Sequence, residues 1–101
     1  MKFIDSRSGA KSTITEGQLT GDTCKYFENE GYSEDDGDFW VSMSYGDELH
    51  FSFHELMNGP KDEIEEEAKE LQEHLYQLHG MKFDLKTCGV RSFKLGIHLI
   101  D

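Results

Sequence analysis

The chain has few positively charged residues, few cysteines and few prolines. Its 101 residues include 10 Lys and Arg against 21 Asp and Glu, together with two Cys and one Pro. Two cysteines are too few for the disulfide framework of a small secreted domain or for a CxxC metal knuckle. Free cysteine usually behaves as a small hydrophobe, so Cys24 and Cys88 are interpreted as free thiols, with a disulfide or a reactive role left open.

Long hydrophobic runs are also absent. No window approaches the roughly 18 apolar residues of a membrane span, and the opening MKFIDSRSG lacks the apolar stretch of a signal peptide. We therefore expect a soluble, cytoplasmic protein. The length predicts one domain over residues 1–101, and seven Phe, four Tyr and one Trp can supply its core.

Recognisable catalytic motifs are missing as well. The chain has no GxSxG, P-loop, GxGxxG or HExxH sequence, and an abundance of acids does not identify a particular acid–base pair. We expect no enzyme activity and no cofactor. The alternative is a small acid/base or metal-dependent enzyme that uses His50 or His54. These histidines lie four apart on a predicted strand, roughly 13 Å from each other, which is too far for one shared metal.

The stretch YSEDDGDFW, residues 32–40, places four carboxylates and a glycine in five consecutive positions. An EF-hand loop requires acids at alternate positions, a glycine at the sixth and a glutamate at the twelfth. Counted from Glu34, the glycine is fourth and the twelfth residue is Tyr45. The pattern therefore predicts a turn that leads into a strand at Phe39, either solvated or part of a docking edge, and no metal site.

Negative charge is concentrated in the middle of the chain. Residues 21–58 carry ten acids against Lys25 alone, and residues 59–79 carry seven acids against two lysines. Both ends are mildly basic. Such a field repels nucleic acid and anionic membranes and attracts cationic surfaces. A basic protein is the predicted partner, although acidity that only maintains solubility is the simpler alternative.

The segment 59–80 predicts a long helix. Pro60 suits the first helical position, acids crowd the N-terminal end, and Gly80 suits the position after the last turn. Apolar residues recur at spacings of four and three and form one stripe: Ile64, Ala68, Leu71, Leu75 and Leu78. The glutamates lie off this stripe, so one side of the helix is predicted to pack and the other to be acidic.

The remaining pattern indicates β-structure. Apolar and polar residues alternate over 39–53 and again over 81–86 and 93–100, which predicts two hairpins. The segments 22–28 and 11–15 are interpreted as further strands. The prediction is an α+β fold, an antiparallel sheet of four to six strands with one long helix packed across one face. One helix covers one side of the sheet, so the other face should be solvated or available for contact.

Acids and aromatics together suggest a partner-binding surface, in which carboxylates attract a basic protein and aromatics supply affinity. The predicted partner-binding residues are Tyr32, Glu34, Asp35, Asp36, Asp38, Trp40, Asp47, Glu48, Glu63, Glu66, Glu67, Glu70 and Glu73.

These observations favour a non-catalytic, acidic inhibitor or interaction protein. It would bind and occlude a basic, nucleic-acid-binding surface of a nuclease, a toxin or a nucleic-acid-guided effector by imitating phosphate charge. In size and charge alone the chain is similar to immunity proteins and to phage-encoded anti-defence or anti-CRISPR inhibitors. A dimerising adaptor or chaperone that uses the uncovered sheet face, with a homodimer through that face, is a further alternative.

Overall fold

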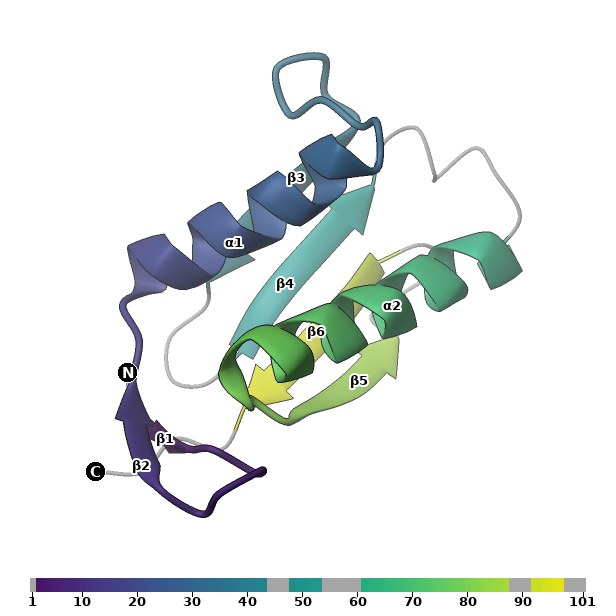
Figure 1. Ribbon diagram of the computed structural model, residues 1–101. Coiled ribbons are helices and arrows are strands. Elements are labelled where there is room, and N and C mark those ends of the chain that lie inside the picture. Colours follow the sequence, from purple (N-terminus) through teal and green to yellow (C-terminus); the bar gives the residue numbers. More distant parts are fainter. Residues whose placement is uncertain (1, 44–47, 54–60, 88–91, 98–101) are drawn as a thin grey trace.

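The computed structural model describes residues 2–43, 48–53, 61–87 and 92–97. Its elements, in chain order, are β1 (Lys2–Ile4), β2 (Lys11–Thr13), α1 (Glu16–Asn29), β3 (Phe39–Met43), β4 (Glu48–Phe53), α2 (Lys61–His79), β5 (Phe83–Thr87) and β6 (Ser92–Ile97). Strands β3 to β6 form an antiparallel sheet in the order β3-β4-β6-β5, and β1 pairs with β2 as a separate hairpin (Figure 1).

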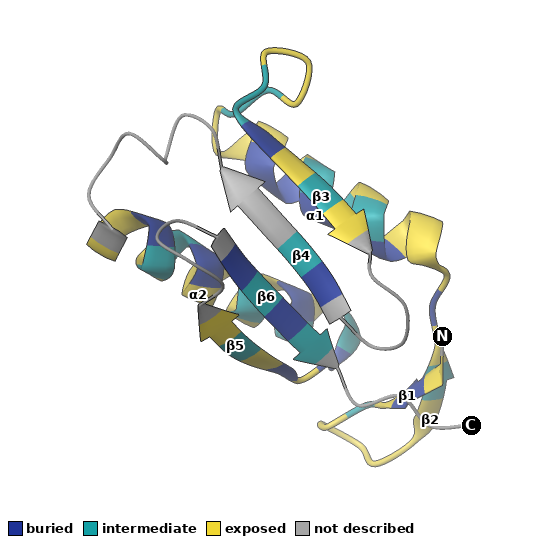
Figure 2. Cartoon of the chain, turned by 180° about the vertical axis from the view of Figure 1, so that it is seen from behind, coloured by how far each residue is buried: buried dark blue, intermediate teal, exposed yellow. Residues whose placement is uncertain are grey.

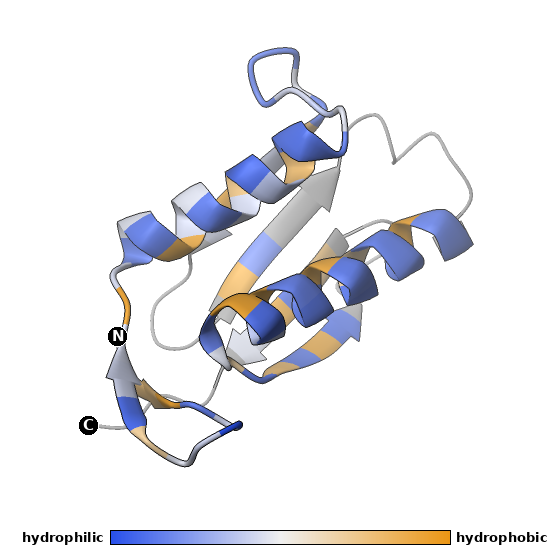
Figure 3. Cartoon of the chain, in the orientation of Figure 1, coloured by the Kyte–Doolittle hydropathy of each residue, from blue (hydrophilic) through white to orange (hydrophobic). Residues whose placement is uncertain are grey.

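The α+β class, the helix α2 and both predicted hairpins are confirmed. Helix α2 ends where Gly80 adopts a φ of 73°, and the Gly80 amide donates to the Tyr76 carbonyl at 2.7 Å. Four residues of the predicted apolar stripe are buried, whereas Leu78 is 49% exposed because it lies at the end of the stripe, in the last turn. Figure 3 shows this division along α2, with hydrophobic positions on the side toward the sheet.

The predicted strand at 22–28 is wrong, because these residues belong to helix α1. Leu19, Thr23, Tyr26 and Phe27 are buried and share one helical face through spacings of three, four, seven and eight. Thr15 caps the helix: its hydroxyl accepts from the Gln18 amide at 3.1 Å, and the Gln18 side chain accepts from the Thr15 amide at 3.0 Å. This reciprocal capping box outweighs Gly17 and Gly21, which favour a loop.

The fold therefore has two helices where one was expected. Helix α1 packs on β3, and α2 packs on β5 and β6. Both lie on the same face of the sheet, and the opposite face is seen without a covering element in the reverse view (Figure 2). The predicted uncovered face is therefore confirmed for the described residues, although the number of helices was not. This uncovered surface is called the open face below.

The core lies between the helices and the sheet. Phe27 of α1 is fully buried and stacks on Phe39 of β3, with ring centroids 4.8 Å apart. In the part of the core beneath α2, Leu71 and Leu75 belong to the same cluster as Phe93 and Leu95 of β6. Aromatic pairs of this kind contribute about 0.5–1.5 kcal/mol beyond the area they bury. The stacked pair fixes the end of α1 and the start of β3, between which the acidic loop lies.

The β1–β2 hairpin is fastened to the end of α2. The Ser6 amide donates to the Gly80 carbonyl at 2.9 Å, and Arg7 Nη1 donates to the Gln77 carbonyl at 2.9 Å. Arg7 also pairs with Asp5 at 3.0 Å, and this hydrogen-bonded guanidinium holds the pKa of Asp5 below its usual value. The predicted strand at 11–15 is shorter, since β2 ends at Thr13 and Thr15 is the cap of α1.

Candidate functional site

Acidic residues of α2 meet the C-terminal end of α1 around a small hollow. The hollow has a volume of about 220 Å³ and is lined by Tyr32, Glu63, Glu66, Glu67 and Glu70. All five belong to the predicted partner-binding set. The four glutamates lie within eight residues of α2 and occupy one side of it, because spacings of three, four and seven return to the same helical face. These five residues are called the acidic cleft.

Tyr32 is positioned by α1. Its amide donates to the Phe27 carbonyl at 3.0 Å, and its ring meets the Phe27 ring edge-on with centroids 6.3 Å apart. The pKa of Tyr32 is raised, mainly by burial and next by the charge of Glu67. The Tyr32 side chain is therefore an uncharged, half-buried aromatic surrounded by carboxylates.

Glu67 lies deepest in the cleft. Its Oε1 atom is buried and has no hydrogen-bond partner among the described residues. Burial raises the pKa of Glu67; hydrogen bonding from Tyr26 lowers it, and the charges of Glu30 and Glu70 add to the increase. A buried carboxylate oxygen without a donor loses hydration without compensation. Glu67 therefore keeps one buried oxygen, Oε1, that a cation or a further hydrogen-bond donor would satisfy.

Tyr26 and Glu30 extend this environment from α1. The pKa of Tyr26 is raised, first by burial and next by the charge of Glu67. The centroid of the Tyr26 ring also lies 5.0 Å from the centroid of the His74 ring. Neither Tyr26 nor Glu30 was among the predicted partner-binding residues, and the predicted strand at 22–28 did not place Tyr26 beside α2. The capping pair Thr15 and Gln18 was the signal that could have placed them on a helix.

The predicted acidic loop, residues 33–38, is a hydrogen-bonded turn. The Ser33 amide donates to Asp38 Oδ2 at 2.7 Å, and the Asp38 amide donates to the Ser33 carbonyl at 3.0 Å. Gly37 adopts a φ of 77°, a left-handed conformation that glycine permits without strain. Asp38 is therefore used to close the turn, whereas Asp35 and Asp36 are exposed.

Glu34 joins this loop to α1. The Cys24 thiol donates to Glu34 Oε2 at 3.3 Å. Burial, and next the carboxylate of Glu34, raise the pKa of Cys24 to about 12. Cys24 is a free cysteine, as predicted, and its high pKa argues against nucleophilic use. Cys88 lies outside the described residues.

Other predicted site residues are not brought to the cleft. Phe39 is buried against α1, so Trp40, the next residue of β3, lies on the open face and is 40% exposed. Glu73, one turn beyond Glu70 on α2, does not line the cleft; it lines another hollow with Lys69 and Gln72, and its carboxylate accepts from Gln77 at 2.8 Å. Glu48 is the first residue of β4 and pairs with Gly96 of β6. Asp47 lies outside the described residues.

The histidines do not assemble a catalytic or metal centre in the part of the chain that the structure describes. His50 lies on the open face between Ser42 and Lys94, its cross-strand neighbours, and His54 is outside the described residues. Among the described residues no group of three or more His, Cys, Asp or Glu side chains could hold a metal ion. Sequence reasoning missed one pair, His79 and Asp22, whose Nε2 and Oδ2 atoms lie 2.6 Å apart and link the two helices.

Comparison with family models, curated proteins and solved structures gives no significant match to this chain. Within the described residues, no helix is both long enough and apolar enough to cross a membrane.

Proposed function

We propose that the chain is a non-catalytic inhibitor or interaction protein that binds and occludes a basic, nucleic-acid-binding surface of another protein. The observation that carries the proposal is the acidic cleft, where four carboxylates of α2 surround a half-buried tyrosine in a hollow of about 220 Å³. The basic partner would be a nuclease, a toxin or a nucleic-acid-guided effector, as in immunity or phage anti-defence systems.

The arrangement suits recognition of Lys and Arg. Carboxylates accept charge-assisted hydrogen bonds from ammonium and guanidinium groups, and the Tyr32 ring offers a surface on which a guanidinium can stack. The buried Glu67 Oε1 atom lacks a donor among the described residues, so an inserted cation would satisfy it. Asp35 and Asp36 on the nearby loop extend the negative field toward solvent, where it increases the rate of encounter.

Imitation of nucleic acid needs closely spaced negative charges. Each strand of DNA carries one phosphate charge for about every 3.4 Å of the helix axis, and side chains three or four positions apart on a protein helix have Cβ atoms about 5–6 Å apart. Glu63, Glu66 and Glu70 follow this helical spacing on the exposed side of α2. A surface that normally binds a phosphate strand would therefore find several carboxylates within its reach, and no turnover is required for inhibition.

The test uses two variants with the same change in net charge. Glu66→Gln/Glu70→Gln removes two carboxylates from the cleft, and Glu16→Gln/Glu73→Gln removes two carboxylates outside it. Each immobilised protein is used to capture basic proteins from a lysate of its source cells at low salt, and the captured protein is then assayed for nucleic-acid binding.

The expected result is a stoichiometric complex that dissociates as the salt concentration is raised. The cleft variant should weaken the binding affinity about tenfold or more, and the control variant should change it little. The captured protein should lose nucleic-acid binding in proportion to the inhibitor added. Equal capture by both variants, or a captured protein that still binds nucleic acid, would refute the proposal.

A further inference from the structure

Strand β5 lies at one edge of the four-stranded sheet, beside α2. Its residue Phe83 is opposite Ile97 of β6, but the Phe83 carbonyl accepts a hydrogen bond from the Gln72 side chain of α2. The backbone groups of Phe83 therefore point away from β6. Because these directions alternate along a strand, the amide and carbonyl of Leu85 also point away from β6, toward the edge that no other described strand occupies.

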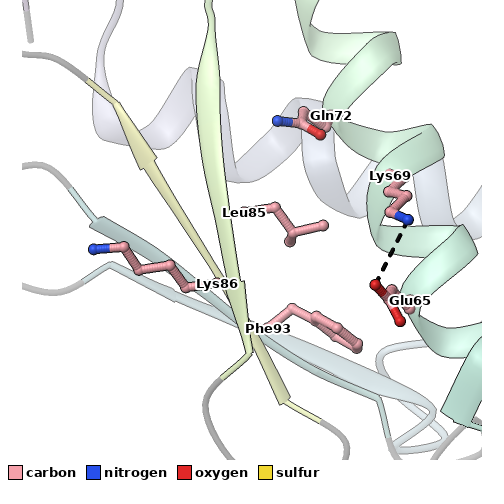
Figure 4. A pocket seen from close by; sticks show the side chains of 6 residues that line it. All are labelled: Glu65, Lys69, Gln72, Leu85, Lys86 and Phe93. Carbon is pink, nitrogen blue, oxygen red and sulfur yellow. Dashed lines mark ion pairs between the residues drawn. The ribbon is translucent and has the colours of Figure 1, made fainter.

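The edge is covered at one end and accessible further along. Gln72 blocks strand pairing at Phe83, since its amide occupies the carbonyl. Beyond it, an open hollow of about 810 Å³ lies between α2 and the sheet, lined by Glu65, Lys69, Gln72, Leu85, Lys86 and Phe93. Figure 4 shows Leu85 and Phe93 pointing toward α2, whereas Lys86 extends away from it. An added strand would lie along Leu85 and close this hollow.

The side chains of β5 alternate in charge on the open face. Asp84 and Lys86 are both exposed and flank Leu85. An antiparallel pairing of β5 with the β5 strand of a second copy, centred on Leu85, places Asp84 of one chain opposite Lys86 of the other, twice. Cross-strand pairs of opposite charge stabilise a sheet, and like charges directly opposite destabilise it.

Neighbouring registers lack this complementarity. A pairing centred on Asp84 places the two Asp84 residues opposite each other and each Lys82 opposite a Lys86. A pairing centred on Lys86 places the two Lys86 residues opposite each other. Charged side chains on an edge strand deter unspecific association, and here they favour one register only.

We propose that β5 is a self-association edge, at which two copies of this chain pair antiparallel about Leu85 into one continuous eight-stranded sheet. The backbone of Leu85 exchanges both hydrogen bonds with its counterpart, and the two Leu85 side chains meet in the hollow beside α2. The contact uses the edge of the sheet, leaving its open face and the acidic cleft uncovered, and it is independent of the inhibitor function.

The test is the dimer dissociation constant of purified protein, measured by sedimentation velocity over a concentration series. The variants are Asp84→Lys, Lys86→Asp and the exchange of both residues, with folding checked by circular dichroism. Each single variant replaces two attractive cross-strand pairs by two repulsive ones and should raise the dissociation constant about tenfold. The exchange variant restores the complementary pairs and should return the constant to within about threefold of the original.

The two single variants also separate pairing from overall charge. Asp84→Lys reduces the net negative charge and Lys86→Asp increases it, so a dimer governed by net charge alone would be strengthened by the first and weakened by the second. The control variant Trp40→Ser alters the open face and should leave the dimer unchanged. A monomer at all concentrations, opposite effects of the two single variants, or a dimer lost only in Trp40→Ser would overturn the proposal.

Discussion

The two faces of the sheet differ in what they contact and in the charges that they carry. On one face, α1 and α2 bury the apolar side of every strand and present their own acids to solvent, among them the four glutamates of the cleft. On the open face, Ser42, His50, Lys94 and Lys86 lie in one cross-strand row. The charge of −11 is thus distributed unevenly.

This difference teaches that net charge alone does not identify a binding surface. The glutamates converge on the cleft because helical spacing places them on one side of α2, and contacts of Tyr26 with His74 and of Asp22 with His79 hold α1 beside α2. The exposed aspartates of the loop at 33–38 remain on a turn. The open face carries Asp84 beside Lys86 and Lys94, charges of both signs, so a basic partner is attracted more strongly to the helix side. The following experiments alter the two faces separately.

The largest expected effect comes from two consecutive residues of β3 that lie on opposite faces. Phe39→Ala removes a ring that is 1% exposed and stacked on Phe27, and should lower the free energy of unfolding by about 3–5 kcal/mol. Trp40→Ala, on the open face, should cost about 1 kcal/mol or less. Urea denaturation measures both, and equal losses would show that the open face is packed.

The helix layer is fastened to the β1–β2 hairpin at Gly80. A Cβ atom at Gly80 would lie 2.0 Å from Asp5 Oδ1, and the φ of +73° is strained for other residues. Gly31 has a φ of +97° with open space around it. Gly80→Ala should therefore cost about 2–3 kcal/mol, and Gly31→Ala about 1 kcal/mol. If thermal unfolding shows the two variants to be equally stable, the contact with Asp5 has no energetic role.

Removal of the buried charge from the cleft should stabilise the fold in a pH-dependent way. Because the pKa of Glu67 is raised above its usual value of 4.5, the folded state binds its proton more tightly, and ionisation at higher pH destabilises it. Glu67→Gln should therefore raise the melting temperature at pH 7. Its advantage should narrow as the pH falls through the folded pKa and disappear below about 4.5.

The matched control for this measurement is Glu16→Gln, which removes an exposed carboxylate from the first turn of α1. It should change the melting temperature little, or lower it slightly, since a negative charge favours the helix N-terminus. A Glu67→Gln variant that is less stable at pH 7 would mean that the carboxylate is paired in the free protein.

The smallest expected effect concerns the loop at 33–38. In a Cys88→Ser background, Cys24 should react with a disulfide reagent at pH 8 at least about tenfold more slowly than an unstructured cysteine, because its pKa is raised to about 12. Glu34→Gln should increase the rate only a few-fold, since burial is the larger cause. A rate equal to that of a free thiol would show that Cys24 is neither buried nor hydrogen-bonded to Glu34 in solution.

The sequence predicted α2 and the two hairpins because their apolar residues follow one period over many positions. It did not predict α1, since DTCKYFE also alternates and two glycines interrupt the helical pattern, and only the pair Thr15 and Gln18 marks the start. The sequence pattern identified the glutamates of the cleft but did not separate Glu73 from them. The position of α1, which was not predicted, determines which glutamates of α2 line the cleft. Trp40 was assigned to the same partner-binding surface as the glutamates, because the sequence does not show that the helices cover only the opposite face of the sheet.

The placement of both helices on one face has a consequence for motion in solution. The cleft glutamates lie on the helix side, whereas the open face carries Asp84, Lys86 and Lys94, charges of both signs; negative charge in the described part of the molecule is therefore displaced toward the helix side, as in a dipole across the sheet. A cationic surface exerts a torque on such a dipole and turns the helix side toward itself before contact. Orientation, and not attraction alone, would then favour productive collisions over unproductive ones.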